Sequence, residues 1–318
     1  MLRILPLASG FHSPSQVRET AHRMSQRLRA HGIGHEFVES GDQANLLFVV
    51  TGGTEHLALK ALEGRPGPVL LLAHPDQNSL PASMEILCHA QQNGKKGRIV
   101  LLNEREDGIE ELRRLARHQE IRERMGSCRL GRIGLPSDWL VGSMPSATLS
   151  RQVWGPEVVD VPLEALRAAM DDARDDEVAA LQEDFRSGAT EIREPSGNDL
   201  VLAARVGAGL RRVMQEHRLD ACTVRCFDLV LDLKTTGCLA LSSLLDAGIV
   251  AGCEGDLPAA LTMLWLQETS GRTTFMANPQ DLDPATGTLW LAHCTVARRL
   301  LKRYHLRSHF ESSLGVGI

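Results

Sequence analysis

Short apolar runs alternate with stretches of helical periodicity along the first third of the chain. This alternation is typical of a parallel sheet wrapped by helices, so the sequence predicts an α/β fold. Ser13 or Ser15 can cap the first helix, and Gly32 ends it. The pattern predicts strands at residues 3–8, 35–39, 46–50, 69–73 and 98–102, and helices at 16–30, 56–62, 83–92 and 106–124.

The composition changes near residue 127, where a charged helix gives way to glycine and leucine. We therefore predict two Rossmann-like or flavodoxin-like domains with parallel sheets flanked by helices, at residues 1–126 and 127–300, followed by an extension at 301–318. Residues 161–177 form an amphipathic stretch. The remaining predicted strands are 132–135, 222–227, 249–253, 273–276 and 288–292, and the remaining predicted helices are 200–217, 235–245 and 258–267.

Two turns in the first half carry polar groups that can bind ligands. The Gly52-Gly53 turn lies between a strand and a helix, where backbone N–H groups hold anions. It lacks the spacing of a dinucleotide fingerprint or a P-loop, so a plain tight turn is favoured. The turn from His74 to Pro81 follows a strand at the edge where open α/β sheets bind ligands. Its polar residues, Asn78 and Ser79 among them, suit a sugar or another polyol, although ordinary turn chemistry explains them about as well.

Polar side chains also follow the predicted strands of the second half. Asp228 comes after one strand, Glu254 and Asp256 after the next, and His293 after the last. The carboxyl ends of parallel strands meet at one edge of a sheet, so we expect these side chains to lie together. Two carboxylates and an imidazole can bind a divalent metal and supply a base for proton transfer.

Each of these residues also has a structural explanation. Asp256 is well placed to cap the helix that begins at Pro258. A histidine at a strand end, such as His293, is more often a hydrogen-bonded residue than a ligand. Glu254 is harder to explain in this way, because a carboxylate after a buried apolar strand needs a partner.

Seven cysteines, an odd number spread over a long chain with no signal peptide, indicate a reduced, cytoplasmic protein. Several of them invite a zinc proposal, but they lack the paired short spacings of a structural zinc site, so buried thiols are favoured. The cysteines considered for zinc are Cys222, Cys226, Cys238, Cys253 and Cys294.

Charge and composition narrow the function classes further. The formal net charge of -5 offers no global positive field for nucleic acid or anionic lipid, and an aromatic content of 4% offers few stacking platforms. No apolar run reaches the length of a membrane span. The expected partners are therefore small molecules and other subunits, with no nucleic acid and no membrane.

At several motifs the sequence resembles the L-fucose and L-arabinose isomerases and their uncharacterised relatives. The most specific motif is the stretch Gly252-Cys253-Glu254-Gly255-Asp256-Leu257-Pro258. The others are Thr51-Gly52-Gly53-Thr54-Glu55, the turn from His74 to Pro81, Arg225-Cys226-Phe227-Asp228-Leu229, Ala260-Leu261-Thr262-Met263 and Ala292-His293-Cys294.

The resemblance implies two stacked α/β domains and a Mn²⁺-dependent interconversion of an aldose and a ketose through an enediol. It also implies a homo-oligomer, a trimer or hexamer, in which a neighbour's amino-terminal domain completes each site. Glu254 and Asp256 match the acid/base and metal-ligating pair, and His293 resembles a ligand histidine of the arabinose branch. The third domain of the family, a β-barrel, is absent from this sequence, and residues 309–318 resemble its beginning.

The chain departs from the family pattern at two positions. Ala277 and Asn278 stand where the arabinose branch has its second acidic ligand, and Gly237 stands near the position of the other glutamate of the fucose branch. Asp228 is the candidate substitute.

Three functions follow from these observations. The first is a sugar isomerase, with Glu254 and Asp256 as catalytic groups, Asn78, Ser79 and Asp228 as substrate-binding groups, and Glu254, Asp256 and His293 as metal ligands. The second is a non-catalytic sugar-binding or assembly subunit that retains the fold. The third is a nucleotide-binding regulator built on the Gly52-Gly53 turn.

Overall fold

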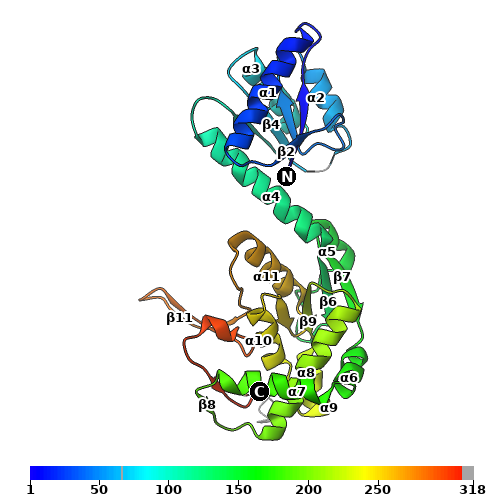
Figure 1. Ribbon diagram of the computed structural model, residues 1–318, viewed down its shortest axis with the longest axis vertical. Helices are drawn as coiled ribbons and strands as arrows, with labels where there is room; N and C mark the ends of the chain where they lie inside the picture. The colour runs from blue at the N-terminus through cyan, green and yellow to red at the C-terminus, as the bar shows by residue number, and fades with distance from the viewer. Residues whose placement is uncertain (66, 310–318) are drawn as a thin grey trace. The chain divides into compact units, whose positions relative to one another are not determined.

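The computed structural model describes residues 1–65 and 67–309 (Figure 1). The chain divides into two compact units, the first ending at Arg122 and the second beginning at Glu123, and helix α4 (Asp107–Ser127) crosses this division. Both units contain a parallel sheet flanked by helices, which confirms the predicted α/β class. A search of the described residues finds no helix that could span a membrane.

The first unit is built on a five-stranded parallel sheet with the strand order β2-β1-β3-β4-β5, the order of flavodoxin-like folds. All five strands lie within two residues of the predicted positions. They are β1 (Leu2–Leu7), β2 (His35–Phe37), β3 (Leu46–Val49), β4 (Val69–Ala73) and β5 (Gly97–Leu101).

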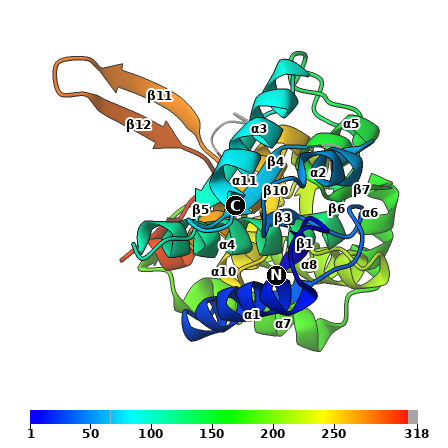
Figure 2. The same ribbon diagram turned by 90° about the horizontal axis from the view of Figure 1, so that it is seen from above.

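Helices cover both faces of this sheet (Figures 1 and 2). Alternate side chains of a strand point to opposite faces, so the sheet supports two separate cores. On one face α1 (Pro14–Ala30) and α4 pack on residues such as Ile4 and Phe48. On the other face α2 (Glu55–Leu62) and α3 (Ser79–Gln92) pack on residues such as Val49 and Leu71.

Two helix starts test the predicted caps. Ser13 caps α1 in a reciprocal capping box with Gln16, which confirms one of the two predicted caps. Helix α3 begins at Ser79, earlier than the predicted residue 83. Pro81 lies inside its first turn, where a proline is tolerated because the first backbone N–H groups have no helical partner.

The second unit contains a four-stranded parallel sheet with the order β10-β9-β6-β7. Its first strand along the chain, β6, lies between β7 and β9, so the strand order reverses beside β6 as it does beside β1 in the first unit. The strands are β6 (Arg129–Ile133), β7 (Glu157–Val161), β9 (Ala221–Val224) and β10 (Ala251–Cys253).

Helix α8 (Gly197–Glu216) lies at the centre of the helical layer and packs against α6 (Leu163–Asp171), α7 (Asp175–Ser187) and α10 (Cys238–Asp246). The predicted amphipathic stretch 161–177 is thus two helices. Gly209 allows a close approach of α8 to α6, because a Cβ there would lie 2.9 Å from Cγ of Met170. The remaining helices are α5 (Ala147–Trp154), α9 (Cys226–Leu233) and α11 (Leu257–Ser270).

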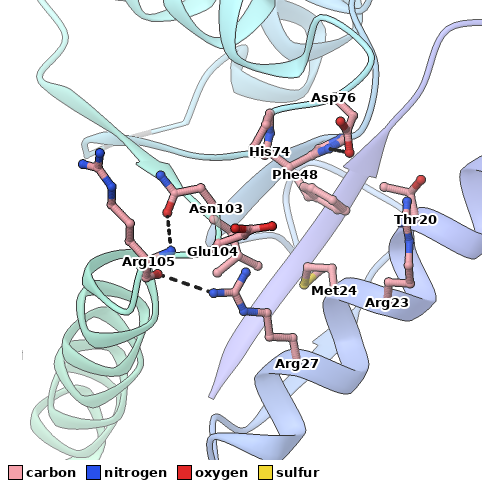
Figure 3. Close-up of a pocket in the computed structure, with 12 residues that line it drawn as sticks. Thr20, Arg23, Met24, Arg27, Phe48, His74, Asp76, Asn103, Glu104 and Arg105 are labelled. Carbon is pink, nitrogen blue, oxygen red and sulfur yellow. Dashed lines mark hydrogen bonds and ion pairs between the residues drawn. The ribbon is translucent and has the colours of Figure 1, made fainter.

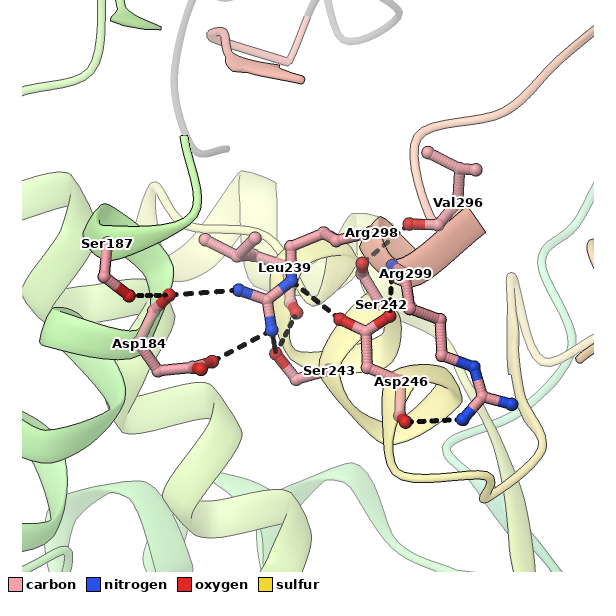
Figure 4. A network of polar contacts seen from close by, with 9 residues as sticks. All are labelled: Asp184, Ser187, Leu239, Ser242, Ser243, Asp246, Val296, Arg298 and Arg299. Atoms are coloured by element: carbon pink, nitrogen blue, oxygen red, sulfur yellow. Dashed lines mark hydrogen bonds and ion pairs between the residues drawn. The ribbon is translucent and has the colours of Figure 1, made fainter. Parts of the chain in front are cut away.

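An ion-pair network joins α10 to α7 and to the short helix η1 (Arg298–Leu300), as Figure 4 shows. The Arg298 guanidinium lies 2.9 Å from a carboxylate oxygen of both Asp184 and Asp246, and it donates a hydrogen bond to Ser243. These carboxylates raise the pKa of Arg298, although its burial acts in the opposite direction and is the largest single effect. Beyond η1, β13 (His305–Leu306) pairs with β8 (Glu191–Ile192).

Three predictions for the second unit are wrong. Residues 273–276 form no strand. Residues 288–292 do form a strand, β12 (Thr288–Ala292), but it pairs antiparallel with β11 (Asn278–Asp283) in an exposed hairpin outside the parallel sheet (Figure 2). Strand β9 ends at Val224 instead of reaching Asp228, which lies in the first turn of α9.

Candidate functional site

Loops after three neighbouring strands of the second unit meet at the carboxyl edge of its sheet. The N–H of Gly255, after β10, donates to the carbonyl of Val224 at the end of β9, at 3.0 Å. The N–H of Ser137, after β6, donates to the carbonyl of Glu254 at 2.8 Å. The strand order reverses between β6 and β9, so this edge has the position at which open α/β sheets bind ligands.

Glu254 occupies a conformation that costs free energy. Its φ is 64°, in the left-handed region that favours glycine, and Gly255 follows with a φ of 67°. The half-buried carboxylate of Glu254 accepts a hydrogen bond of 2.8 Å from the indole N–H of Trp139. The Trp139 ring in turn packs edge-on against Phe227, with centroids 4.9 Å apart. A strained carboxylate held by a fixed donor is a typical feature of a functional residue.

Asp256 caps helix α11. Its Oδ1 accepts a hydrogen bond of 2.8 Å from the backbone N–H of Ala259, as the sequence suggested as one alternative. Pro258 lies in the first turn of the same helix. One carboxylate oxygen of Asp256 therefore stabilises the N-terminus of α11.

Asp228 forms an ion pair with Arg225. Both carboxylate oxygens of Asp228 lie 2.9 Å from Nε of Arg225, and Asp138 approaches the same guanidinium at 3.3 Å. These contacts raise the pKa of Arg225, with Asp138 the larger cause. Arg225 also donates to the carbonyl of Pro136, so it joins the loops after β6 and β9.

His293 lies just beyond the exposed hairpin, yet its side chain is near the end of β10. Its Nδ1 is 2.9 Å from Oγ1 of Thr295 and 3.7 Å from Sγ of Cys294. One ligand atom from each of Cys253, His293 and Cys294 lies within 4.8 Å of the others. A second group with the same limit consists of Cys238, Cys294 and His309.

The thiols of this region influence one another's protonation. Contacts with Cys238 and Cys253 lower the pKa of Cys294 well below its usual range. The pKa of Cys253 is raised by its contact with Cys226 and by Cys294, and that of Cys238 is raised by Cys294 and by burial. Several thiols thus share one buried environment.

The manganese ligands implied by the family resemblance do not gather in this way. Among the described residues, the groups of three or more side chains close enough to hold a metal consist of cysteines and histidines, and none contains Glu254 or Asp256. These two carboxylates and His293 therefore do not form a complete site for a hard cation, which prefers oxygen ligands.

In the first unit, a cavity of about 660 Å³ opens beside the loops after β4 and β5 (Figure 3). Its polar lining includes Arg23 and Arg27 of α1 together with Asn103 and Glu104 after β5. His74, after β4, donates a hydrogen bond of 2.8 Å from its Nε2–H to the carbonyl of Val50. This cavity offers cationic, anionic and neutral hydrogen-bonding groups to a polar ligand.

Asn78 and Ser79 lie in the turn that follows His74. The Ser79 hydroxyl is fully buried, accepts from the His74 N–H at 3.0 Å and donates to the Val49 carbonyl. Asn78 has a φ of 58° and precedes α3. A Cβ at Gly52 would lie 2.9 Å from Cβ of Asn78, so packing of the two turns explains the glycine at position 52.

Roles for Trp139 and the arginines of α1 were not predicted from the sequence, and Arg225 was noted there only as part of a motif. A strand was predicted to end near residue 135, so the polar and aromatic residues directly after it, Asp138 and Trp139, carried the same positional signal as Glu254. The α1 arginines carried no comparable signal, because a charged helix face is usually only solvated.

No protein-family model matches the chain. A sulfoquinovose isomerase from Alkalicoccus urumqiensis is 28% identical over 102 residues, which are 31% of this chain and 23% of that protein. Sulfoquinovose isomerases from Priestia aryabhattai and Priestia megaterium are 28% identical over 87 residues, or 27% of this chain and 20% of theirs. The match thus spans about a fifth of the length of these curated relatives. Over about 30% of its length the chain is similar to sugar isomerases, and this likeness does not single out the fucose isomerases.

Proposed function

We propose that this protein is a sugar isomerase-like enzyme that interconverts an aldose and a ketose, with Glu254 as the group that moves the proton. The observation that carries the proposal is the half-buried Glu254, held with a φ of 64° at the carboxyl edge of the sheet. Glycine would suit this backbone better, so a carboxylate there calls for a role beyond the fold. The partial similarity to sulfoquinovose isomerases supports the same class of reaction.

The proposed reaction needs one base beside the substrate carbonyl. Glu254 removes the proton from the carbon next to the carbonyl, which gives an enediol, and returns it to the former carbonyl carbon. A hydroxyl proton moves in the same sense, from the oxygen of the carbon that loses its proton to the former carbonyl oxygen, so the conversion is redox neutral overall. The Trp139 N–H holds one oxygen of Glu254 and leaves the other for the proton.

Mn²⁺ is the cofactor that the resemblance implies. The site of this chain provides fewer ligands than this ion needs. Glu254, Asp256 and His293 are the candidates named by the resemblance, and Asp256 already uses one oxygen for α11. The proposed proton transfer therefore relies on Glu254 alone. A homo-oligomer in which another chain completes the site belongs to the same proposal.

Within the first unit, we propose that the cavity beside His74 binds a polar ligand by itself. Arg23 and Arg27 there suit an anionic or polyhydroxy ligand, and Asn78 lies in the adjoining turn. A sulfonated sugar such as the one in the relatives' name falls within this class.

The test is exchange of the substrate's carbon-bound proton with solvent. We would incubate the purified chain, with and without Mn²⁺, with a panel of aldoses and ketoses that includes sulfoquinovose in D₂O, and follow exchange by proton NMR. Glu254→Gln should abolish exchange, while the control Glu164→Gln, on the exposed side of α6, should leave it intact. Equal exchange by wild type and Glu254→Gln would contradict the assignment.

A non-catalytic sugar-binding subunit is the second candidate. It is favoured by one observation, that Asp256 and Asp228 are both engaged by partners within the fold. Sugar binding detected by saturation-transfer NMR, with no exchange for any sugar of the panel, would support this function over the first.

A further inference from the structure

Six sulfur and imidazole side chains gather at the carboxyl edge of the second sheet, although they come from five separate segments. Cys226 and Cys238 are the first residues of α9 and α10, and Cys253 is the last residue of β10. His293 and Cys294 follow the hairpin, and His309 follows β13. Apolar packing alone gives no reason for four thiols and two imidazoles to converge in this way.

Cys294 lies at the centre of the cluster. It belongs both to the group with Cys238 and His309 and to the group with Cys253 and His293, and within each group the ligand atoms lie within 4.8 Å of one another. Sγ of Cys226 lies 2.7 Å from Sγ of Cys253. The side chains of Cys238, Cys253 and His309 are each at most 5% exposed.

We propose that this cluster is a structural zinc site in which Cys238, Cys253, Cys294 and His309 are the ligands. Three thiolates and one imidazole are a standard tetrahedral donor set for Zn²⁺. With ligand bonds of roughly 2.0–2.3 Å, the donor atoms of such a site lie about 3.3–3.8 Å apart. Within each group the donor atoms need to contract by about 1 Å from the 4.8 Å limit, and Cys253, which shares a group with Cys294, must also move toward Cys238 and His309.

The donor chemistry selects the metal. Thiolate and imidazole ligands favour zinc over manganese, magnesium or calcium, which prefer oxygen. Buried thiolates need a nearby cation, because an isolated charge in an apolar interior is strongly unfavourable.

His293 has a positioning role in this proposal. It is adjacent to Cys294 in the chain, and two consecutive residues reach one tetrahedral ion less readily than residues from separate segments. Its Nδ1 already contacts Thr295, so it orients the backbone that carries Cys294. The other ligands come from α10, β10 and the segment after β13.

The zinc ion would tie the segment after β13 and the base of the hairpin to the strand that precedes Glu254. This assignment does not depend on the proposed isomerase activity. It also revises the expectation from sequence, since the spacings of these cysteines resemble no zinc motif and the grouping arises only in the fold.

Metal analysis of the full chain, purified under reducing conditions, tests the site. We expect about one zinc per chain by mass spectrometry, and thiolate-to-metal charge-transfer absorption when Co²⁺ replaces zinc. Recovery of the reduced chain with neither bound zinc nor these cobalt bands would overturn the proposal. Iron together with acid-labile sulfide in place of zinc would also overturn it.

Variants then locate the ligands. Cys294→Ser should lower zinc affinity by more than the roughly 10–100-fold that follows loss of an outer hydrogen-bond partner. Cys222→Ser is the matched control, because Cys222 is a fully buried thiol of the adjacent strand β9 outside both groups. His309→Gln provides a second test if Cys294→Ser fails to fold, as judged by circular dichroism. Wild-type affinity in a folded Cys294→Ser or His309→Gln variant would refute the ligand assignment.

Discussion

The indole N–H of Trp139 donates a 2.8 Å hydrogen bond to Oε2 of Glu254, across 115 residues of sequence. The two residues belong to loops after β6 and β10, and the backbone N–H of Ser137 bonds to the Glu254 carbonyl beside them. The loop after β6 therefore fixes both the backbone and the carboxylate of Glu254. This relationship makes the loop after β6 part of the candidate site.

Replacing Trp139 with phenylalanine removes this hydrogen-bond donor and keeps an aromatic ring against Phe227. A hydrogen bond to a charged group contributes about 1.5–3 kcal/mol, so we expect proton exchange to slow about tenfold or more. The NMR exchange rate measures this. Trp290→Phe, on the exposed hairpin, is the control. Equal exchange rates for the two variants would show that the Trp139 hydrogen bond does not contribute to proton exchange.

Glu254→Gly tests the strain at this position. A non-glycine residue in the left-handed region costs about 1 kcal/mol, which glycine relieves. We therefore expect the free energy of unfolding to stay constant or rise by up to about 1 kcal/mol, while proton exchange is lost. Urea denaturation measures the first effect. A clear loss of stability would mean that Glu254 is retained for the fold.

Gly255→Ala probes the close approach of the same loop. A Cβ there would lie 2.7 Å from the Leu135 carbonyl oxygen, and the φ of 67° is unfavourable for alanine. We expect the free energy of unfolding to fall by about 2 kcal/mol or more. Gly248→Ala is the control, because Gly248 has a φ of 83° but no atom within 4 Å of the added Cβ. Similar losses in both variants would leave only the backbone conformation as the cause.

Asp246 and Asp184 share Arg298 but differ in burial (Figure 4). The Asp246 side chain is 19% exposed and that of Asp184 is 54% exposed. Removing the more buried partner leaves the Arg298 charge poorly compensated, so Asp246→Ala should destabilise the protein by about 2–3 kcal/mol. Asp184→Ala should cost no more than about 1 kcal/mol. Thermal and urea unfolding of both variants check this order, and its reversal would refute the argument from burial.

Glu194 gives the protein an acid-sensitive contact. Its hydrogen bond with Arg307 lowers its pKa from 4.5 to about 2. The unfolded carboxyl binds a proton near its ordinary pKa and the folded one only near 2, so this contact stabilises the fold above the ordinary value and is lost as pH falls toward 2.

Glu194→Gln should therefore make the free energy of unfolding less dependent on pH between about 4.5 and about 2. Urea unfolding at a series of pH values measures this slope. Glu183→Gln, an exposed residue of α7, should leave it unchanged. If Glu194→Gln leaves the pH dependence of the free energy of unfolding unchanged, the contact between Glu194 and Arg307 is not its source.

The strands of the first parallel sheet were the most predictable part of the fold, whereas β7 of the second sheet was not predicted. Runs such as residues 69–73 are apolar throughout and bounded by turn residues, which is typical of strands buried on both faces. The hairpin strand β12 was misplaced for the same reason. Its sequence, Thr288 to Ala292, is also apolar, and periodicity does not reveal which neighbour covers a strand.

The candidate site was only partly predictable. Glu254 and Asp256 follow from their place after a buried strand, a signal local in sequence. The contacts that define the environment of Glu254 are not local, because Trp139 and Ser137 reach it from another strand's loop. The cysteine and histidine cluster depends in the same way on the fold, and no spacing rule links Cys238 to His309.

The hairpin of β11 and β12 has a further consequence. Leu282, Leu289, Trp290 and Leu291 are all about half exposed or more, so they contribute little to the folding of the unit that carries them. Selection for a stable fold therefore constrains these positions weakly. The hairpin is a place where mutation can alter the protein's contacts with other molecules while its folded body stays the same.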